Sequence, residues 1–330
     1  MAQAIDSWFE ELGRPDPFVV IEAGAGVGTL AASVLAAEPA CAAALRYVTV
    51  ERSAVLRAAQ RERLPLETPA FVLGPTDHPD DEEARPLPGQ GPLVTALSEL
   101  PALRFDGVVI ANELLDNLAF HLVERGPEGW LEVRVGQADG ELVEVLVPAS
   151  PDVAEEADRL AADAPVGGRV PLQHRAAEWV RSALAALDRG RVVVIDYADE
   201  SPSLVRRPWS DWVRTYRAHG RGVHPLAAPG TQDVTCEVAV DQLARVSAPA
   251  AVRPQAEFLG AHGMAGLEAE AAAAWEAGAA RGDLASLRAR SRVGEARALA
   301  DPAGLGAFAV VEWAVTGRRR RRDTSTRRAQ

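Results

Sequence analysis

Short apolar runs alternate with longer amphipathic segments through most of the chain, which predicts strands alternating with helices. Uninterrupted apolar runs of this kind are typical of strands buried on both faces of a sheet, and they cover residues 18–21, 47–50, 107–111 and 191–197. Helices are predicted between and after these runs, over 4–12, 29–37, 53–63, 152–163, 174–188, 240–247, 254–262, 265–280 and 283–298. Two further strands are predicted, one near 70–73 and a last one over 305–315.

The alternation is interrupted twice. Between the third apolar run and residue 148, three β-type segments separated by Gly-containing turns predict an antiparallel meander, over 120–125, 130–135 and 142–147. Residues 199–230 have no clear periodicity and predict a long functional loop, and the acidic, Pro-rich residues 75–91 predict a surface loop. The whole pattern predicts an α/β fold, a doubly wound sheet with an inserted antiparallel β-meander and a helical C-terminal insertion.

This organisation divides the chain into four predicted parts. Residues 1–118 form the first half of the sheet, and 119–190 hold the inserted meander with its helices. Residues 191–317 complete the sheet and carry the loop and the helical insertion, and 318–330 form an Arg-rich, disordered tail.

Composition and charge exclude several classes of protein. No apolar run approaches the roughly 20 residues of a membrane span, and the N-terminus lacks the features of a secretory signal. Two cysteines, Cys41 and Cys236, are then expected to be free buried thiols in a reducing cytoplasm. The net charge of −12 argues against non-specific nucleic-acid binding. All 35 basic residues are arginine, which suggests a GC-rich bacterial genome and excludes Schiff-base and phosphate-loop lysines.

The first strand runs into a glycine-rich turn, Glu22-Ala-Gly24-Ala-Gly26-Val-Gly28. A dinucleotide site would require G-x-G-x-x-G, but its third glycine position is Thr29 here. Glu22 would repel a pyrophosphate, whereas it can meet an ammonium group. The turn therefore favours S-adenosylmethionine, which carries an amino-acid moiety and a sulfonium, as the cofactor.

Glu51 follows the second strand, where a carboxylate can accept hydrogen bonds from two ribose hydroxyls. The expected cofactor-binding residues are accordingly Glu22, Gly24, Gly26, Gly28 and Glu51. The alternatives are a purely structural strand–helix turn and, for Glu51, a surface acid at a strand end.

Several motifs resemble one family. The segment Ala111-Asn-Glu-Leu-Leu-Asp-Asn-Leu118 resembles the N-E-x-x-D-x-L segment of the MidA-like S-adenosylmethionine-dependent methyltransferases, which include a mitochondrial complex I assembly arginine methyltransferase. Further similar stretches follow in order, at 194–197, 215–219, 224–226, 229–235 and 302–306. The resemblance implies a seven-strand Rossmann-like methyltransferase sheet, S-adenosylmethionine as donor and, by likeness to the mitochondrial member, a protein arginine as acceptor.

Two departures accompany the resemblance. Family members carry several dozen residues before the glycine-rich strand, and this chain starts almost at that strand, so the usual N-terminal segment is expected to be missing. An acid that meets the adenine amine after strand three is not evident, since Ser98 and Glu99 align only loosely.

The catalytic residues are expected among Asn112, Glu113 and Asp116, which follow the third apolar strand at the cofactor crevice. An arginine acceptor has a pKa above about 12, so it needs carboxylates that localise its charge and take its proton. The alternative makes Asp116 a helix-initiating acid and Glu113 a structural hydrogen-bond acceptor.

The substrate is expected to contact Tyr197, His219, Gln232 and Asp233, which lie at the end of a later strand or in the long loop. Tyr197 could equally be half-buried packing, and Asp233 could cap the segment that follows it. His219 and His224 form no metal set, because no cysteine joins them, and no metal is expected.

The leading hypothesis is a methyltransferase that acts on a protein, with arginine favoured, and a homodimer is a candidate assembly. The alternatives are a small-molecule methyltransferase, which would want a deep apolar pocket, and an S-adenosylmethionine-binding assembly factor with little catalysis. A nicotinamide oxidoreductase is disfavoured by Glu22 and Thr29.

Overall fold

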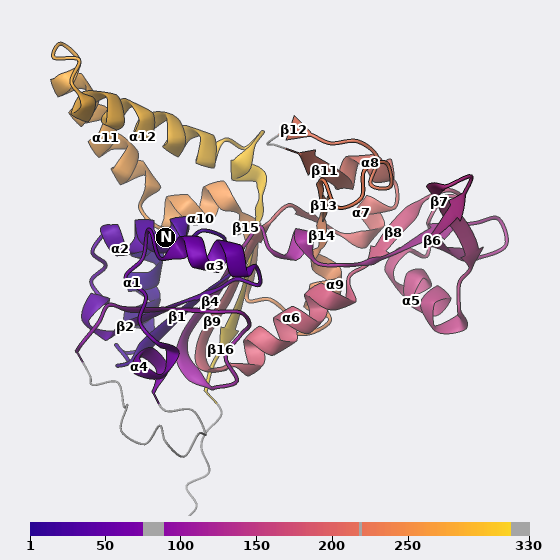
Figure 1. Cartoon of the computed structure of the whole chain (residues 1–330), viewed down its shortest axis with the longest axis horizontal. Coiled ribbons are helices and arrows are strands. Elements are labelled where there is room, and N and C mark those ends of the chain that lie inside the picture. Colours follow the sequence, from indigo (N-terminus) through magenta and orange to yellow (C-terminus); the bar gives the residue numbers. More distant parts are fainter. Residues whose placement is uncertain (75–88, 218–219, 318–330) are drawn as a thin grey trace, which may run out of the picture.

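The computed structural model describes residues 1–74, 89–217 and 220–317. Its centre is a seven-stranded sheet in the order β15-β16-β9-β4-β1-β2-β3 (Figure 1). The strands are β1 (Phe18–Ala23), β2 (Leu45–Val50), β3 (Leu93–Leu97), β4 (Phe105–Asn112), β9 (Leu187–Asp196), β15 (Ala251–Pro254) and β16 (Ala309–Val315). All pairs are parallel except those that β16 makes with β9 and β15. The predicted doubly wound fold is confirmed.

Helices cover both faces of this sheet, which explains why every residue of β1 and β2 is buried. One face packs against α1 (Ala2–Glu11), α2 (Thr29–Ala36) and α10 (Gln255–Ala261). The other packs against α6 (His174–Ala185) and α9 (Val240–Ala244). A short η1 turn (Ala42–Ala44) precedes β2, and α3 (Ala54–Gln60) follows it with Ser53 as its N-cap.

The strand predicted near residues 70–73 is wrong, because these residues form the short helix α4 (Pro69–Leu73). Pro69 occupies the first turn of this helix, where a missing N–H costs nothing, and Thr68 is its N-cap residue. The third parallel strand is β3 instead. The predicted last strand begins later than expected, because Leu305–Ala307 form the turn η3 before β16.

The inserted meander is confirmed and gains a fourth strand. Its sheet has the order β7-β6-β5-β8, with β5 (His121–Arg125), β6 (Trp130–Ala138), β7 (Glu141–Pro148) and β8 (Arg169–Leu172). One face buries Val123, Trp130 and Val170 against α5 (Pro151–Ala161).

The long loop predicted over 199–230 contains regular structure. It holds α7 (Ser201–Leu204), α8 (Trp209–Trp212), β11 (Val213–Arg217) and β12 (Gly220–Arg221). The two strands form a three-stranded sheet with β13 (Asp233–Cys236), which follows the loop. Two more short strands, β10 (Ala198–Asp199) and β14 (Val238–Ala239), pair with each other. These elements are too short to produce a readable period, so pattern analysis missed them.

The helical insertion lies between β15 and β16 as a long hairpin of α11 (Met264–Gly278) and α12 (Leu284–Ala300), which stands out from the body in Figure 1. No helix in the described ranges is long and apolar enough to cross a membrane. Most of the predicted surface loop over 75–91 and the predicted tail over 318–330 lie outside the described residues.

Candidate active site

The glycine-rich turn follows β1 at the carboxyl edge of the sheet. Gly24, Gly26 and Gly28 have φ angles of +72°, +53° and +79°, which L-residues with side chains adopt only under strain. A Cβ on Gly28 would lie 2.8 Å from Cδ1 of Leu64, whereas a Cβ on Gly26 would meet no atom within 4 Å. Gly26 therefore exposes its backbone to open space, where a ligand can approach it closely.

Glu51 and Gln60 hold this turn in place. One carboxylate oxygen of Glu51 accepts the N–H of Gly26 at 3.0 Å, and the other accepts the N–H of Ser53 at 2.8 Å. The amide Nε2 of Gln60 donates to the carbonyl of Gly26 at 2.7 Å. Because a carboxylate can accept about four hydrogen bonds, the half-buried Glu51 keeps acceptor capacity for a ligand hydroxyl.

Glu22 lies beneath the turn, inside the core. Its side chain is only 5% exposed, and the hydroxyl of Tyr47 donates to its Oε2 at 2.8 Å. Burial raises the pKa of Glu22 to about 7, although the hydrogen bond from Tyr47 opposes this shift. Any contribution to ligand binding would pass through the turn and α2.

The raised pKa predicts an unusual pH dependence of stability. Between pH 4.5 and about 7 the native state holds a proton on Glu22 that the unfolded state has lost, so the free energy of unfolding should fall as pH rises through this window. The fall attributable to Glu22 should be about 3 kcal/mol. Urea denaturation of the wild type and Glu22→Gln at pH 5 and pH 8 measures it, since glutamine keeps an acceptor for Tyr47. An unchanged pH dependence in Glu22→Gln, matching that of the exposed control Glu128→Gln, would contradict the assignment.

The predicted catalytic residues lie at the ends of β4 and β9, which are neighbours in the sheet. Asn112 and Glu113 are exposed, and the backbone of Glu113 adopts φ +49° while its N–H donates to the carbonyl of Ile195 at 2.9 Å. A non-glycine residue in this conformation is strained, which is common at functional sites. Asp116 follows in the η2 turn (Leu115–Asn117) and is only 4% exposed.

Asp196, the last residue of β9, was not among the predicted site residues. It is 1% exposed, and its Oδ2 accepts the backbone N–H groups of Leu115 at 3.0 Å and Asp116 at 3.2 Å. Its Oδ1 accepts the N–H of Tyr197 at 2.9 Å. Asp196 thereby ties the η2 turn to β9. Two sequence signals could have identified it, namely its place at the end of a buried strand and the family resemblance of residues 194–197.

Glu113, Asp116 and Asp196 are called the acidic cluster below. Burial, followed by the charge of Glu113, raises the pKa of Asp116 to about 6. Burial, followed by the charge of Asp116, raises the pKa of Asp196 well above its ordinary value. Burial is the main cause of both shifts, and the neighbouring carboxylate adds to each. A positive group placed against the cluster would stabilise the charged forms of these carboxyl groups.

The three hydrogen bonds of Asp196 predict a structural role that can be measured. Asp196→Ala leaves two buried N–H groups and one half-buried N–H group without their acceptor, which should lower the free energy of unfolding by about 2–4 kcal/mol. Asp196→Asn keeps one oxygen for the η2 turn, so its loss should be clearly smaller. Urea denaturation at pH 7 compares the two variants, and equal stabilities would argue against this role.

Tyr197 lies beside the acidic cluster. Its ring centroid is 3.9 Å from that of Phe308, and the guanidinium of Arg214 lies 5.1 Å from its centroid. The pKa of Tyr197 is raised by burial and then by the charges of Glu113 and its neighbours. The half-buried ring is thus both packed and next to the expected catalytic carboxylates.

The three remaining predicted substrate residues are Gln232, Asp233 and His219. Gln232 braces its own loop, because its amide accepts the N–H of Val223 at 3.1 Å and donates to the carbonyl of His224 at 3.1 Å. Asp233 is exposed at the start of β13, a strand that packs against the η2 turn. His219 lies outside the described residues. No metal-binding group of three or more His, Cys, Asp or Glu side chains occurs in the described part of the chain.

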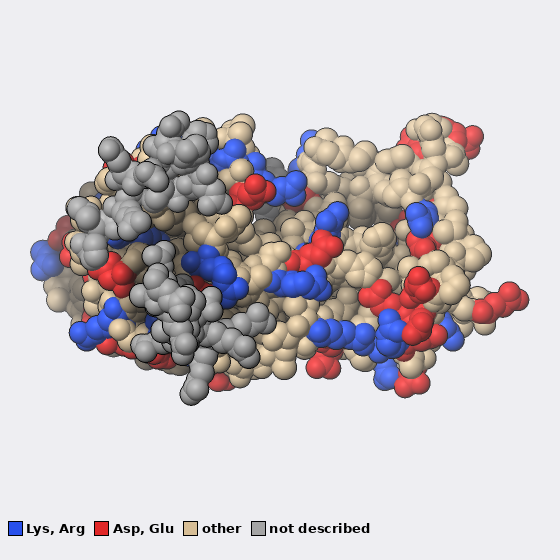
Figure 2. Space-filling model, turned by 90° about the horizontal axis from the view of Figure 1, so that it is seen from below, with Lys and Arg blue, Asp and Glu red and all other residues tan. Residues whose placement is uncertain are grey.

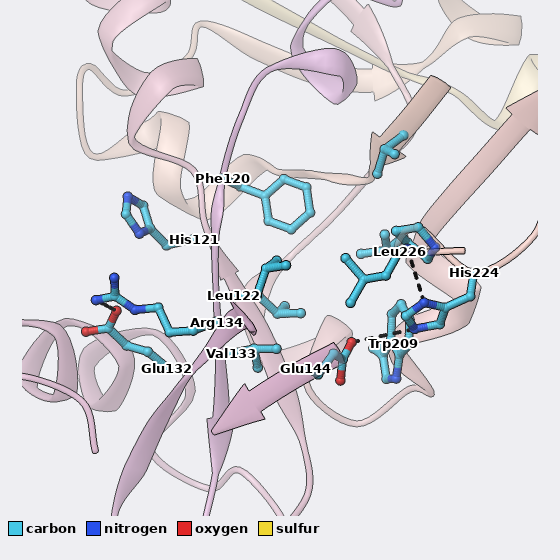
Figure 3. A pocket seen from close by; sticks show the side chains of 14 residues that line it. Phe120, His121, Leu122, Glu132, Val133, Arg134, Glu144, Trp209, His224 and Leu226 are labelled. Carbon is cyan, nitrogen blue, oxygen red and sulfur yellow. Dashed lines mark hydrogen bonds and ion pairs between the residues drawn. The ribbon is translucent and has the colours of Figure 1, made fainter. Parts of the chain in front are cut away.

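A separate cavity of about 230 Å³ lies between the inserted sheet and the segment 209–234 (Figure 3). Phe120, Leu122 and Leu226 converge on it, and Nε2 of His224 lies 3.7 Å from Oε1 of Glu144 at its rim. None of the predicted site residues lines this cavity. On the face seen in Figure 2, acidic and basic side chains are intermingled.

Comparison with protein families matches residues 1–256 to a family described as "Putative S-adenosyl-L-methionine-dependent methyltransferase". An uncharacterized protein from Burkholderia thailandensis is 29% identical with a TM-score of 0.75, and the match covers 96% of this chain and 78% of that one. A protein of the same superfamily and organism, solved bound to S-adenosyl-homocysteine, is 27% identical with a TM-score of 0.73, over 96% and 76% of the two chains. No curated protein matches the chain.

Proposed function

Since the chain belongs to the family of S-adenosyl-L-methionine-dependent methyltransferases, we propose that its acceptor is an arginine side chain of a protein. S-adenosylmethionine, the methyl donor of the family, supplies an electrophilic methyl group on a sulfonium. What remains to be assigned is which residues hold the donor and which hold the acceptor.

The glycine-rich turn suits the donor. The open space above Gly26 allows close approach to the backbone, and the spare acceptor capacity of Glu51 suits a ribose diol. Gly24 and Gly28 supply the turn conformation, and we assign Glu22, which precedes the turn and accepts the hydroxyl of Tyr47, to the donor side as well. The relative bound to S-adenosyl-homocysteine lends support to this assignment.

The observation that carries the acceptor proposal is the acidic cluster. Three carboxylates, two of them with raised pKa values, gather at the same sheet edge as the glycine-rich turn. A guanidinium would offset this charge and form charge-assisted hydrogen bonds with it. The resemblance of residues 111–118 to the MidA-like segment favours the same acceptor.

Each residue of the cluster then has a distinct role. The exposed Glu113 contacts the guanidinium and draws the positive charge of that group away from the nitrogen that accepts the methyl group. It then takes up the proton that this nitrogen releases when the N–CH₃ bond forms. Asp116 adds negative charge from below, and Asp196 positions the η2 turn. We also assign contacts with the acceptor to Asn112, the exposed residue before Glu113, and to Tyr197, whose pKa the charge of Glu113 helps to raise. Gln232 and Asp233 bring the β11–β13 sheet to the flank of the site, where a polypeptide acceptor would pass.

A small-molecule acceptor is the second candidate, because the apolar side chains around the 230 Å³ cavity could bind an apolar compound.

The buried free thiols Cys41 and Cys236 support a reducing compartment, and we place the activity in the cytoplasm.

The test is tritiated-methyl labelling of a cell lysate with the full chain and labelled S-adenosylmethionine. Label in a protein, with methylarginine found after hydrolysis, is the expected result. Label only in small metabolites would reject the protein acceptor in favour of the second candidate. Tight binding of S-adenosyl-homocysteine without any labelling would favour an assembly factor with little catalysis.

A further inference from the structure

The helical hairpin has a closed side and an open side. Its two helices meet along small buried residues, Ala271, Gly278, Ser286, Ala289 and Ala296. On the closed side, Nε of Arg297 pairs with Oε1 of Glu268 at 2.9 Å, and the guanidinium of Arg290 lies 5.5 Å from the ring centroid of Trp275. These contacts satisfy the polar groups of that side within one chain.

The open side carries two exposed stripes at helical spacing. They comprise Leu267, Glu270 and Ala274 on α11, and Leu284, Arg288, Arg292, Glu295 and Leu299 on α12. Seen along the hairpin, one helix runs toward the viewer and the other away, so successive residues turn in opposite directions around the two helix axes. The two stripes therefore lie on the same side of the hairpin. Leu267 is 51% exposed and Leu284 is 71% exposed. In the described part of the chain, Glu270, Arg288 and Arg292 form no ion pair.

We propose that a second copy of the chain docks on this open side, hairpin against hairpin, about a two-fold axis parallel to the hairpin. The charges of the helices select this arrangement. The charged residues of α11 are all acidic (Glu268, Glu270 and Glu276), whereas α12 carries four arginines and one glutamate. Packing α11 on the partner's α11, or α12 on the partner's α12, would oppose like charges, so each α11 packs on the partner's α12.

The register of the hairpin pairs the exposed residues across the axis. The contacts Glu268–Arg297 and Gly278–Ser286 place Leu267 close to the level of Leu299 and Glu270 within about one helical turn of Arg292. A two-fold axis parallel to the hairpin preserves these levels. Leu267 then meets the partner's Leu299, and Glu270 meets the partner's Arg292, each contact occurring twice in a four-helix bundle.

Sedimentation velocity of the full chain over a concentration series tests the dimer. Glu270→Arg and Arg292→Glu each oppose like charges twice, and each should raise the dimer dissociation constant at least about tenfold. An equimolar mixture of the two variants should recover the dimer, because both contacts of the mixed pair again join opposite charges. The chain carrying both substitutions should also recover it.

Recovery of the dimer by the mixture or by the double variant would show that the single variants lost a contact and did not misfold. Glu128→Arg, on an exposed turn of the inserted sheet, is the matched charge-reversal control. A wild-type chain that sediments as a monomer at every concentration would overturn the proposal. So would single variants that dimerise like the wild type, or a mixture no more dimeric than its components.

Discussion

Glu113→Gln is expected to lower the rate of methyl transfer by about two to three orders of magnitude, since a positioned acid–base group contributes about that much. The amide cannot take up the proton of the acceptor nitrogen, and it removes the most accessible negative charge of the acidic cluster. Glutamine should keep the strained backbone at φ +49°, because its shape matches that of glutamate. The measurement is the initial rate of tritiated-methyl incorporation into lysate protein, with the affinity for S-adenosyl-homocysteine measured by calorimetry.

The donor affinity should stay within a few-fold of the wild type, because Glu113 belongs to the acceptor side of the site. Glu128→Gln removes an exposed charge on the turn between β5 and β6, outside the cluster, and serves as the matched control. A Glu113→Gln chain that labels protein at the wild-type rate would remove Glu113 from the mechanism. The acceptor would then have to be deprotonated by another group.

Gly26→Val is expected to weaken S-adenosyl-homocysteine binding by at least about a hundredfold, the equivalent of roughly 2.7 kcal/mol. A branched side chain at Gly26 would fill the open space that a ligand needs, because no atom lies within 4 Å of its Cβ position. The same residue would adopt φ +53°, at a cost of about 1–2 kcal/mol to folding. Calorimetry measures the affinity and thermal unfolding measures the stability.

Gly140→Val isolates the second effect. Gly140 lies between β6 and β7 with φ +83° and also has no atom within 4 Å of its Cβ position, so it imposes similar backbone strain outside the site. Both variants should lose a similar amount of stability, and only Gly26→Val should lose donor affinity. Equal affinities in the two variants would mean that the donor does not approach this turn.

Local pattern was enough to identify most of the parallel sheet. Helices cover both faces of the sheet, so its inner strands are apolar on both sides. The resulting apolar runs in the sequence identified β1, β2, β4 and β9. The glycine turn was equally readable, since three positive φ angles require glycine whatever surrounds them. Short elements such as β8, β11 and β15 were missed, because four or five residues do not establish a period.

The sequence by itself determined the sheet, the turn and the identity of the residues at the strand ends. Only the tertiary structure decided how those residues combine. It buried the carboxylate of Glu22 against the hydroxyl of Tyr47, and it brought Asp196 against Asp116 from a strand 80 residues later. It also left one side of the hairpin exposed among the residues that the structure describes. The physical reason is that burial, raised pKa values and unpaired charge depend on neighbouring residues that are distant in the sequence. The spacing of apolar residues within one segment contains no information about those neighbours.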